Sequence, residues 1–437
     1  MEIQKEAKVD EKRERAVIVG LNATSNSARG NENDIDESMA ELAKLAEAAG
    51  AEVVASIIQN RASRDVGYYV GKGKIEEIKE QVLLLEATIV IFNDELSGTQ
   101  IKNIEELLGT KILDRAALIL DIFAQRALSK EGKLQVELAQ LRYRLPRLQG
   151  LGKQMSRTGG GIGTRGPGEQ KLEIDRRYIL NRVTNIKREL EEVKKYRSVQ
   201  RAQRSKASIP LVALVGYTNA GKSTLLNELI KTHQDYSEDK EVLVKDMLFA
   251  SLDVTLRKAV LPSKKEFLVV DTVGFVSKLP HDLVEAFKAT LEEVKFADLI
   301  IHVIDASNDN HEIQMNTTLE VLKALEVQNK SMITVYNKID LFDTEINYKN
   351  SEDVLYISAR NNLNMDKLLQ AIEQKLTKNT YAVTMAIPFE RGDIPNTLKN
   401  KYYIEKFEYR EEGIKLDINL DEQDYNRYKD FIIYCHP

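Results

Sequence analysis

The sequence predicts an α/β protein whose largest part is a doubly wound, mostly parallel sheet. Three observations support this fold class. Apolar runs of strand length alternate with helix-like stretches over residues 16–128 and again over residues 210–378, as in parallel α/β domains. Leucines at heptad spacing occupy the segment between these two regions, which is typical of paired helices. A glycine-rich loop follows the apolar run at 210–216 and precedes a helical stretch, as at the first strand of many doubly wound sheets.

The changes in pattern divide the 437 residues into four parts, within the roughly two to four domains expected at this length. They are an N-terminal α/β domain (1–128), a basic antiparallel helical hairpin (129–205) with a glycine-rich tip (150–168), the doubly wound domain (206–379) and a small C-terminal α+β domain (380–437). The alternating apolar run at 414–420 predicts a half-buried strand in the last of these.

The composition favours a folded protein of a reducing compartment. Hydrophobic residues make up 43% of the chain, which is enough for buried cores. The single cysteine, Cys435, cannot form an internal disulfide. No run of ~18 apolar residues occurs and the first residues are charged, so neither a membrane span nor a signal peptide is predicted. We expect a soluble, monomeric, cytoplasmic protein, and peripheral attachment to a membrane surface stays open.

Within the N-terminal domain, strands are predicted at residues 16–20, 51–57 and 88–92. One helix is expected to end near Gly50, a second to begin near Lys74 and a third to open at Ser97. The segment 71–74, Gly-Lys-Gly-Lys, could bind phosphate, but it lacks the spacing of a P-loop. A plain strand-to-helix turn is therefore favoured there.

Two apolar seams at heptad spacing predict the helical hairpin. The first contains Leu134, Leu138, Leu141, Leu145 and Leu148, and the second contains Ile179, Val183, Ile186, Leu190 and Val193. Such seams pair two helices through their apolar faces. Pro146 is expected to end or kink the first helix near its top.

The hairpin is strongly basic, unlike the rest of the chain. Residues 130–206 hold 20 Lys and Arg against 8 Asp and Glu, which leaves 43 basic against 60 acidic residues elsewhere. The tip contains eight glycines and no acidic residue, so its backbone can approach a polyanion closely. We predict contacts with nucleic-acid phosphate groups from Lys153, Arg157 and Arg165, because their charges suit such groups. The alternative is a disordered connector.

The doubly wound domain begins with a phosphate-binding motif. Residues 198–208 are expected to form a linker that leads into a buried strand at 210–216. The next residues, from Gly216 to Ser223, read Gly-Tyr-Thr-Asn-Ala-Gly-Lys-Ser and lead into a helical run. This is the spacing of a P-loop, in which backbone N–H groups wrap the phosphates. Lys222 is expected to bridge β- and γ-phosphate oxygens, and the Ser223 hydroxyl to bind Mg²⁺.

Three later motifs, in a fixed order, specify the base. One apolar strand delivers Asp271 for the Mg²⁺ shell and Gly274 for the γ-phosphate. A second delivers Asn337-Lys338-Ile339-Asp340, where the last carboxylate can accept from both N1–H and N2–H₂ of guanine. The Ala359 N–H then follows for guanine O6. Together these motifs predict a P-loop GTPase domain that binds GTP and GDP and prefers GTP to ATP.

The chain resembles the HflX family of translational GTPases over nearly its whole length. The resemblance rests on the tip at 159–169, on 249–253 (Phe-Ala-Ser-Leu-Asp), on 271–275 (Asp-Thr-Val-Gly-Phe) and on 279–284 (Leu-Pro-His-Asp-Leu-Val). It implies that residues 249–253 are the first switch and that Ser251 supplies a hydroxyl to Mg²⁺, where the family usually has threonine. Thr255 is the alternative ligand.

The resemblance also implies binding to the large ribosomal subunit and its rRNA, not to DNA, and the use of GTP to dissociate or rescue stalled or idle ribosomes. A cationic hairpin suits this polyanionic partner. Two other functions stay open: a GTP-gated RNA chaperone or helicase in ribosome assembly, and a regulatory GTP switch for a protein effector.

Hydrolysis of GTP to GDP and phosphate is expected to depend on Mg²⁺ and to be slow without the ribosome. Phe275 stands where many small GTPases have a glutamine that orients the attacking water, and a phenylalanine cannot do so. Asn219 either holds K⁺ beside the phosphates or stabilises the loop, and the second role is favoured. His281 is assigned a capping or packing role rather than a catalytic one.

The motifs give a complete set of predicted site residues. Catalysis is assigned to Lys222, Asp271 and Gly274, and Mg²⁺ ligation to Ser223 and Ser251. Nucleotide contacts are assigned to Gly216, Tyr217, Thr218, Asn219, Ala220, Gly221, Lys222, Ser223, Thr224, Phe249, Ala250, Ser251, Leu252, Asp253, Asp271, Thr272, Val273, Gly274, Asn337, Lys338, Ile339, Asp340, Ser358, Ala359 and Arg360.

Overall fold

The protein is described by a computed structural model. It describes residues 13–23, 33–155, 167–206, 209–232, 255–272, 274–276, 293–327, 330–342, 350–377, 380–402, 404–410 and 412–435. The chain forms two compact units, of which the first contains the described residues up to Ser198 and the second the described residues that follow. The predicted α/β fold class, with a mostly parallel sheet in the second unit, is confirmed.

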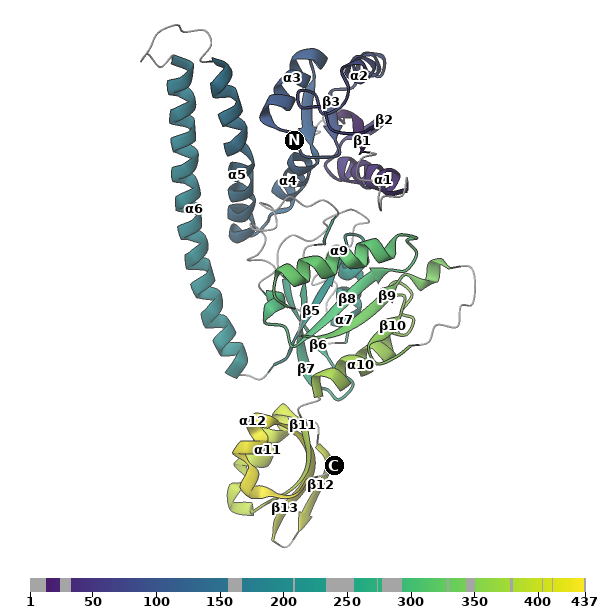
Figure 1. Cartoon of the computed structure of the whole chain (residues 1–437). Coiled ribbons are helices and arrows are strands. Elements are labelled where there is room, and N and C mark those ends of the chain that lie inside the picture. Colours follow the sequence, from purple (N-terminus) through teal and green to yellow (C-terminus); the bar gives the residue numbers. More distant parts are fainter. Residues whose placement is uncertain are drawn as a thin grey trace, which may run out of the picture. The chain divides into compact units, whose positions relative to one another are not determined.

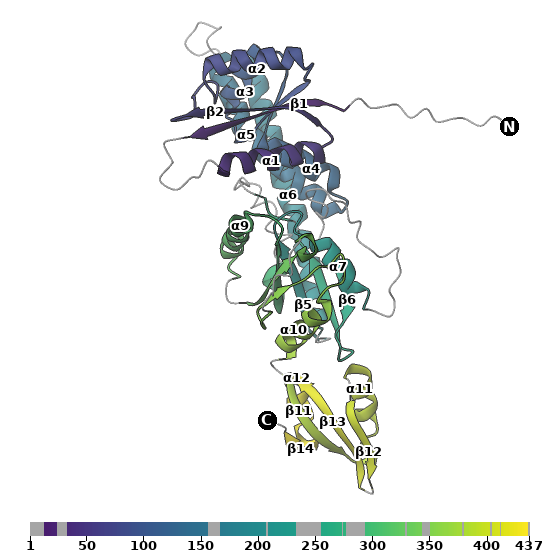
Figure 2. The same cartoon turned by 90° about the vertical axis from the view of Figure 1, so that its right-hand side faces the viewer.

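The first unit begins with a four-stranded parallel sheet in the order β2-β1-β3-β4 (Figure 1). Its strands are β1 (Arg15–Ala23), β2 (Glu52–Arg61), β3 (Ile89–Phe92) and β4 (Lys111–Asp114), and its helices are α1 (Asn33–Ala48), α2 (Lys72–Leu84), α3 (Gly98–Leu108) and α4 (Arg115–Arg126). Figure 2 shows α2 and α3 on one face of the sheet and α1 and α4 on the other. Because both faces are covered, β1 is buried at every position from Ala16 to Leu21.

Short-range signals set the helix starts in this domain. Ser97 Oγ accepts a hydrogen bond from Gln100 N at 3.2 Å, and the Ser97 N–H donates to Gln100 Oε1 at 3.0 Å, which is a capping box. Gly109 ends α3 in the left-handed region at φ +66°, where glycine is favoured. Gly71 precedes α2, and its N–H donates to Gln59 Oε1 at 2.7 Å. The predicted helix start at Ser97 is therefore confirmed.

Helices α5 (Lys130–Met155) and α6 (Pro167–Lys206) lie side by side and run in opposite directions (Figure 1). A narrow apolar seam joins them, made of Leu134, Leu138 and Ile186 with Leu141, Val183 and Leu190 packed against it. The Arg182 guanidinium adds two hydrogen bonds of 2.7 Å to the Glu137 carboxylate. All six seam residues belong to the two predicted heptad seams.

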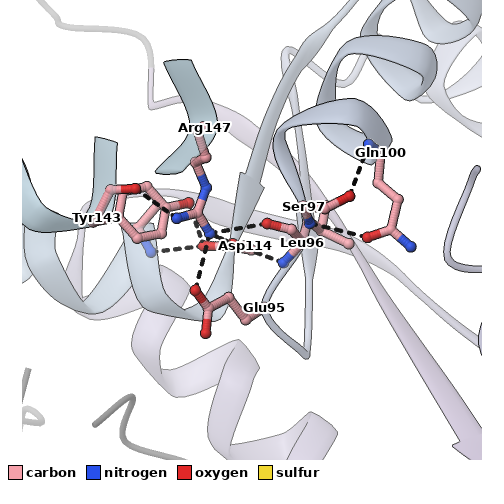
Figure 3. Close-up of polar contacts among 8 residues, drawn as sticks. Glu95, Leu96, Ser97, Gln100, Asp114, Tyr143 and Arg147 are labelled. Atoms are coloured by element: carbon pink, nitrogen blue, oxygen red, sulfur yellow. Dashed lines mark hydrogen bonds and ion pairs between the residues drawn. The ribbon is translucent and has the colours of Figure 1, made fainter. Parts of the chain in front are cut away.

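The Asp114 cluster, made of Asp114, Leu96, Ala117, Tyr143 and Arg147, fastens α5 to the N-terminal domain (Figure 3). The Asp114 carboxylate is fully buried at the end of β4. Its Oδ1 accepts from Ala117 N at 2.8 Å and from Tyr143 Oη at 2.7 Å, and its Oδ2 accepts from Leu96 N at 2.9 Å and from Arg147 Nη2 at 3.0 Å. Burial and the Asp114 charge raise the pKa of Tyr143, so its hydroxyl stays a donor.

Two expected helix ends are wrong, while a kink at Pro146 stays a prediction. Pro146 does not end α5, which continues to Met155. A proline cannot donate to the carbonyl four residues earlier, here that of Arg142, and one residue further on the Arg147 Nη1 donates to the Tyr143 carbonyl oxygen at 2.7 Å. Residues 198–206 are not a linker, because α6 extends through Lys206.

The second unit contains a six-stranded sheet in the order β10-β9-β8-β5-β7-β6, parallel except for β6. Its strands are β5 (Leu211–Gly216), β6 (Thr255–Val260), β7 (Glu266–Asp271), β8 (Leu299–Asp305), β9 (Ser331–Asn337) and β10 (Val354–Tyr356). Its helices are α7 (Lys222–Ile230), α9 (His311–Ala324), α10 (Met365–Thr377) and the short 3-10 helix η4 (Ile339–Leu341). Residues of α7 and α10 pack on one face and residues of α9 on the other, which makes β5 fully buried. The carboxyl ends of the parallel strands, where such sheets bind ligands, therefore meet at one edge.

The chain ends in a four-stranded antiparallel sheet with helices packed on one face. Its elements are β11 (Thr380–Ile387), η5 (Phe389–Arg391), α11 (Asp393–Lys401), β12 (Ile404–Arg410), β13 (Gly413–Asp421), α12 (Glu422–Arg427), η6 (Lys429–Phe431) and β14 (Ile432–Cys435). The alternating residues of β13 are buried, as its sequence pattern predicts: Ile414, Leu416, Ile418 and Leu420. Among the helices of the described segments, none combines the length and the apolar character that crossing a membrane requires.

Candidate functional site: a guanine-nucleotide pocket

The P-loop connects β5 to α7 through two glycines that nothing larger can replace. Gly216 has φ +154°, and a Cβ there would lie 2.1 Å from the Val303 carbonyl oxygen. Gly221 has φ +90°, and a Cβ there would lie 2.2 Å from Asn337 Nδ2. Side chains rarely adopt these backbone angles. The glycines therefore let the loop pass close to β8 and to the base-binding strand β9.

Lys222, the first residue of α7, points back into the loop. Its Nζ donates to the Gly216 carbonyl at 3.0 Å and to the Tyr217 carbonyl at 2.6 Å. Burial lowers the pKa of Lys222 to about 8, against the opposing effect of the Asp271 carboxylate. An anion in the loop would stabilise the ammonium form, because opposite charges attract strongly at a site with little water. The geometry is that required for binding phosphate.

A hydroxyl and a carboxylate meet beside Lys222 and fit a magnesium ion. Ser223 Oγ donates to Asp271 Oδ2 at 3.1 Å, and Asp271 is fully buried at the carboxyl end of β7. Hard oxygen ligands of this kind suit Mg²⁺, which is usually held by one or two protein groups together with phosphates and water. The other predicted ligand, Ser251, lies outside the described residues, as does the side chain of its alternative, Thr255.

The segment after β7 lies directly against the P-loop. The Thr218 N–H donates to the Phe275 carbonyl at 2.8 Å, and the Phe275 N–H donates to the Gly216 carbonyl at 3.2 Å. A Cβ on Gly274 would lie 2.7 Å from Thr218 Cγ2 and 3.0 Å from Lys222 Nζ, so only glycine allows this approach. Gly274 therefore lies beside the lysine that is predicted to hold the γ-phosphate.

The Phe275 side chain faces the protein interior and not the loop. It is 3% exposed and packs in an apolar cluster with Tyr217 and Val294. A buried phenyl ring offers no hydrogen bond to a water molecule at the phosphates. This placement agrees with the prediction that Phe275 cannot orient the attacking water.

Two other loop residues have structural surroundings. The Thr272 hydroxyl donates to the Leu214 carbonyl at 2.7 Å and is buried, so this side chain supports β5 in the described structure. Asn219 is exposed at φ +61°, a region in which asparagine is enriched, and this fits the loop-stabilising role. Its K⁺ role stays a prediction.

Asn337 connects the three parts of the base pocket. Its Nδ2 donates to the Ala220 carbonyl of the P-loop at 2.9 Å, and its Oδ1 accepts from Ala359 N at 3.0 Å. The Ala359 N–H, predicted to meet guanine O6, is thus already at the pocket, where Asn337 accepts its hydrogen bond. Asn337 is buried, so these bonds fix the position of the loop that carries Lys338 and Asp340.

Asp340 and Lys338 complete the side of the pocket that faces the base. Asp340 Oδ1 is buried and has no hydrogen-bond partner among the described residues. A buried carboxylate oxygen without a donor is unstable, and the N1–H and N2–H₂ groups of guanine would supply the donors. Lys338 Nζ lies 2.8 Å from Asp305 Oδ2. Sequence reasoning missed Asp305, although an acidic residue at the end of an apolar strand beside β9 is a usable signal.

The other predicted residues divide into three groups. Thr224 lies in α7 and Ile339 in η4, while Arg360 is exposed and the buried Ser358 Oγ accepts from Asn361 N at 3.1 Å. Outside the described residues are Phe249, Ala250, Ser251, Leu252, Asp253, Val273, His281, Arg157 and Arg165. Lys153 lies in α5, but its side chain is not described.

Comparison with known proteins agrees with this site. Residues 211–338 match the family model described as 50S ribosome-binding GTPase, residues 36–124 the model GTP-binding GTPase N-terminal, and residues 126–204 the model GTP-binding GTPase Middle Region. GTPase HflX of Caldanaerobacter subterraneus subsp. tengcongensis is 50% identical over 421 residues, which cover 96% of this chain and 94% of that protein.

GTPase HflX of Escherichia coli is 40% identical over 397 residues, which cover 90% of this chain and 91% of that protein. Among solved structures, the GDP complex of a protein named SsGBP is 25% identical and covers 84% of this chain and 99% of its own, with a TM-score of 0.47. The P-loop, the base motif and the extent of these matches together show that the chain is a GTP-hydrolysing enzyme of the HflX family of GTPases.

Proposed function

We propose that this GTPase binds the large ribosomal subunit through its basic hairpin and uses GTP to dissociate or rescue stalled or idle ribosomes. The match of residues 211–338 to a family described as 50S ribosome-binding GTPase supports the choice of partner. The relatives are named as GTPases only, so the splitting activity is the new element of the proposal.

The observation that carries the proposal is the form of the hairpin. At about 1.5 Å per residue, the 40 residues of α6 span about 60 Å. Among the side chains of α6 that the structure describes, only Ile179 and Ile186 are buried, and Arg176, Arg177 and Lys187 are exposed. Tyr178 is 70% exposed, and aromatic rings among basic residues suit stacking on unpaired bases. The hairpin is thus built as a long cationic rod, with Lys153, Arg157 and Arg165 proposed as RNA contacts near its tip.

The nucleotide site supplies the switch. We assign Lys222 to the β- and γ-phosphates, the Gly274 N–H to the γ-phosphate, and Ser223 and Asp271 to the magnesium ion. When bound, Mg²⁺ neutralises negative charge on the phosphate oxygens. Loss of the γ-phosphate would remove a partner from Lys222 and Gly274, and this change would release the segment that begins at Gly274.

Sedimentation of intact ribosomes tests the proposal. The protein with GTP should convert intact ribosomes into subunits, whereas deletion of residues 150–168 or the triple change Arg176→Gln, Arg177→Gln and Lys187→Gln should abolish most of this conversion. The matched control changes one exposed lysine in each of the other three parts: Lys44→Gln, Lys367→Gln and Lys429→Gln.

Two other results would point to a different function. RNA unwinding without loss of intact ribosomes would favour an RNA chaperone or helicase in ribosome assembly. Ribosome-independent binding that survives the tip deletion and lacks salt dependence would favour a switch for a protein effector.

A further inference from the structure

Asp305 and Lys338 form an ion pair at the edge of the base pocket. Lys338 Nζ lies 2.8 Å from Asp305 Oδ2, and the two side chains are 23% and 14% exposed. Asp305 ends β8 and lies opposite Asn337, the residue that ends β9 and precedes Lys338. The parallel pairing of these two strands therefore brings the pair together.

The Asp305 carboxylate is held in place from its own side of the pocket. Its Oδ1 accepts from the Ser307 N–H at 3.1 Å and from the Ser307 hydroxyl at 2.6 Å, as in a turn closed by an aspartate side chain. The Asn308 N–H donates to the Asp305 carbonyl at 3.3 Å. Because Oδ1 is used in this way, Oδ2 is left to face Lys338.

Lys338 is fixed at both ends. Its backbone lies in the left-handed region at φ +67°, which is unusual for a residue with a side chain. Its ammonium group is held by Asp305. Between these points lie four methylene groups, and a lysine stem of this kind commonly covers an apolar surface while its charge stays at a polar group.

We propose that Asp305 is a positioning residue for guanine, which holds Lys338 so that its methylene stem covers one face of the base whose edge Asp340 binds. A free lysine side chain loses much rotamer entropy when it is ordered on a ligand. An ion pair that orders the side chain beforehand reduces that loss, and the gain appears as a slower release of nucleotide.

The competing explanation is that Asp305 only stabilises its own loop, through the two hydrogen bonds that it accepts from Ser307 and not through the ion pair. Pairs exposed to this degree often contribute little to stability. The two explanations differ in what they require of Lys338. A positioning role acts through the lysine, whereas a structural role weakens the pocket whether or not the lysine carries a charge.

A double-mutant cycle on the full chain separates them, with GDP affinity and GDP dissociation rate as readouts. We expect Asp305→Asn to weaken GDP binding about tenfold, mostly through faster dissociation. In a Lys338→Met background, which keeps an unbranched stem without the charge, the same change should have less than about a twofold effect. Asp309→Asn removes the same charge from an exposed position in the same loop and should alter binding less than about twofold.

Inosine diphosphate provides a second readout, because it lacks the 2-amino group that Asp340 is predicted to bind. Asp305→Asn should weaken GDP and inosine diphosphate binding by the same factor and leave their ratio unchanged. If Asp305→Asn brought the affinities for GDP and inosine diphosphate close to each other, the effect would lie at Asp340 and the proposal would be overturned. An equal loss in the Lys338→Met background, or no loss in the wild-type background, would overturn it as well. The outcome does not depend on the ribosomal function.

Discussion

At the scale of single residues, the site has side chains placed to bind a nucleotide, whereas the residue at the usual catalytic position, Phe275, is apolar. Lys222, Asn337 and Asp340 have the positions that holding a guanine nucleotide requires, with an unsatisfied carboxylate oxygen at Asp340. Phe275, at the position where many GTPases carry a catalytic glutamine, is part of the core. A phenyl ring in the core cannot orient the attacking water, and this accounts for an expected slow intrinsic rate.

Replacement of Phe275 by glutamine should not restore catalysis. The side chain lies in the core, so Phe275→Gln should destabilise the GTPase domain by about 3 kcal/mol through lost packing and a buried amide. Intrinsic phosphate release, measured in single-turnover assays without ribosomes, should change less than about twofold. Phe275→Leu, which keeps an apolar side chain, should cost at most about 1.5 kcal/mol. A tenfold faster release by Phe275→Gln would show that this position reaches the phosphates.

His302 makes the GTPase domain sensitive to acid. It is buried in β8, and burial, with a smaller effect of the Lys222 charge, lowers its pKa from 6.5 to about 4. Between these values the unfolded chain binds a proton that the folded chain does not, so stability falls as the pH drops below 6.5. The loss should reach about 2 kcal/mol by pH 5.

Urea unfolding between pH 7.5 and pH 5, followed by hydrogen exchange in β8, measures this loss. In His302→Met the free energy of unfolding should fall much less between pH 7.5 and pH 5, because the variant has no titrating group at that position. His311→Gln, at the partly exposed start of α9, should lose as much free energy of unfolding at acidic pH as the wild type. An unchanged loss in His302→Met would contradict the assignment.

At the scale of elements, the Asp114 cluster makes α5 a continuation of the N-terminal domain. Asp114 is fully buried and accepts four hydrogen bonds, of which two come from α5 side chains (Figure 3). Loss of the Arg147 partner would leave a buried carboxylate with less positive charge beside it. The attachment of α5 to the N-terminal domain therefore depends on this polar cluster.

Arg147→Ala should open this cluster at a cost of about 3 kcal/mol. The amides of Leu96 and Ala117, which donate to Asp114, should then exchange their hydrogens about 100-fold faster, at 1.4 kcal/mol per factor of ten. Arg144→Ala removes an exposed arginine from the same helix and should leave exchange within about threefold. Unchanged exchange in Arg147→Ala would show that the Asp114 cluster does not depend on Arg147.

Local sequence patterns predicted the helices well where a single short-range signal determines the structure. The Ser97 cap and the heptad residues of the hairpin are local signals, and the structure contains both. Pro146 does not end α5. The Arg147 side chain beside it is held by Asp114 from β4 and binds the Tyr143 carbonyl, and such contacts between residues far apart in the sequence are not visible in a local pattern. The end of α6 was placed too early because polar, charged residues suit an exposed helix as well as a linker.

The residues assigned to the nucleotide were predicted more completely than the residues that hold them in position. Glycine-rich and Asn-Lys-x-Asp motifs have a fixed spacing, so Lys222 and Asp340 could be assigned from the sequence alone. Asp305 was missed: its place at the end of an apolar strand is visible in the sequence, but its role depends on β8 and β9 being neighbours in the sheet. The Thr272 hydroxyl binds the Leu214 carbonyl, a contact that strand pairing creates, and its predicted contact with the nucleotide stays a prediction.

At the scale of the whole molecule, the basic hairpin and the nucleotide site belong to different parts of one chain. Helix α6 continues to Lys206 and β5 begins at Leu211, so only a few residues separate the long basic helix from the strand that leads to the P-loop. This direct connection gives the hairpin and the nucleotide site a short covalent link. The proposed function requires that binding of the ribosome to the hairpin changes the nucleotide site.

The rate of GTP hydrolysis with and without ribosomes tests this coupling most directly. We expect the purified protein alone to turn over at or below ~10⁻³ s⁻¹, and ribosomes to raise the rate by a factor of ~10³–10⁵, the range seen when a partner completes a GTPase site. Such a factor corresponds to ~4–7 kcal/mol of transition-state stabilisation. Deletion of residues 150–168 should remove most of the increase while GDP affinity stays unchanged. Equal rates with and without ribosomes would contradict the account.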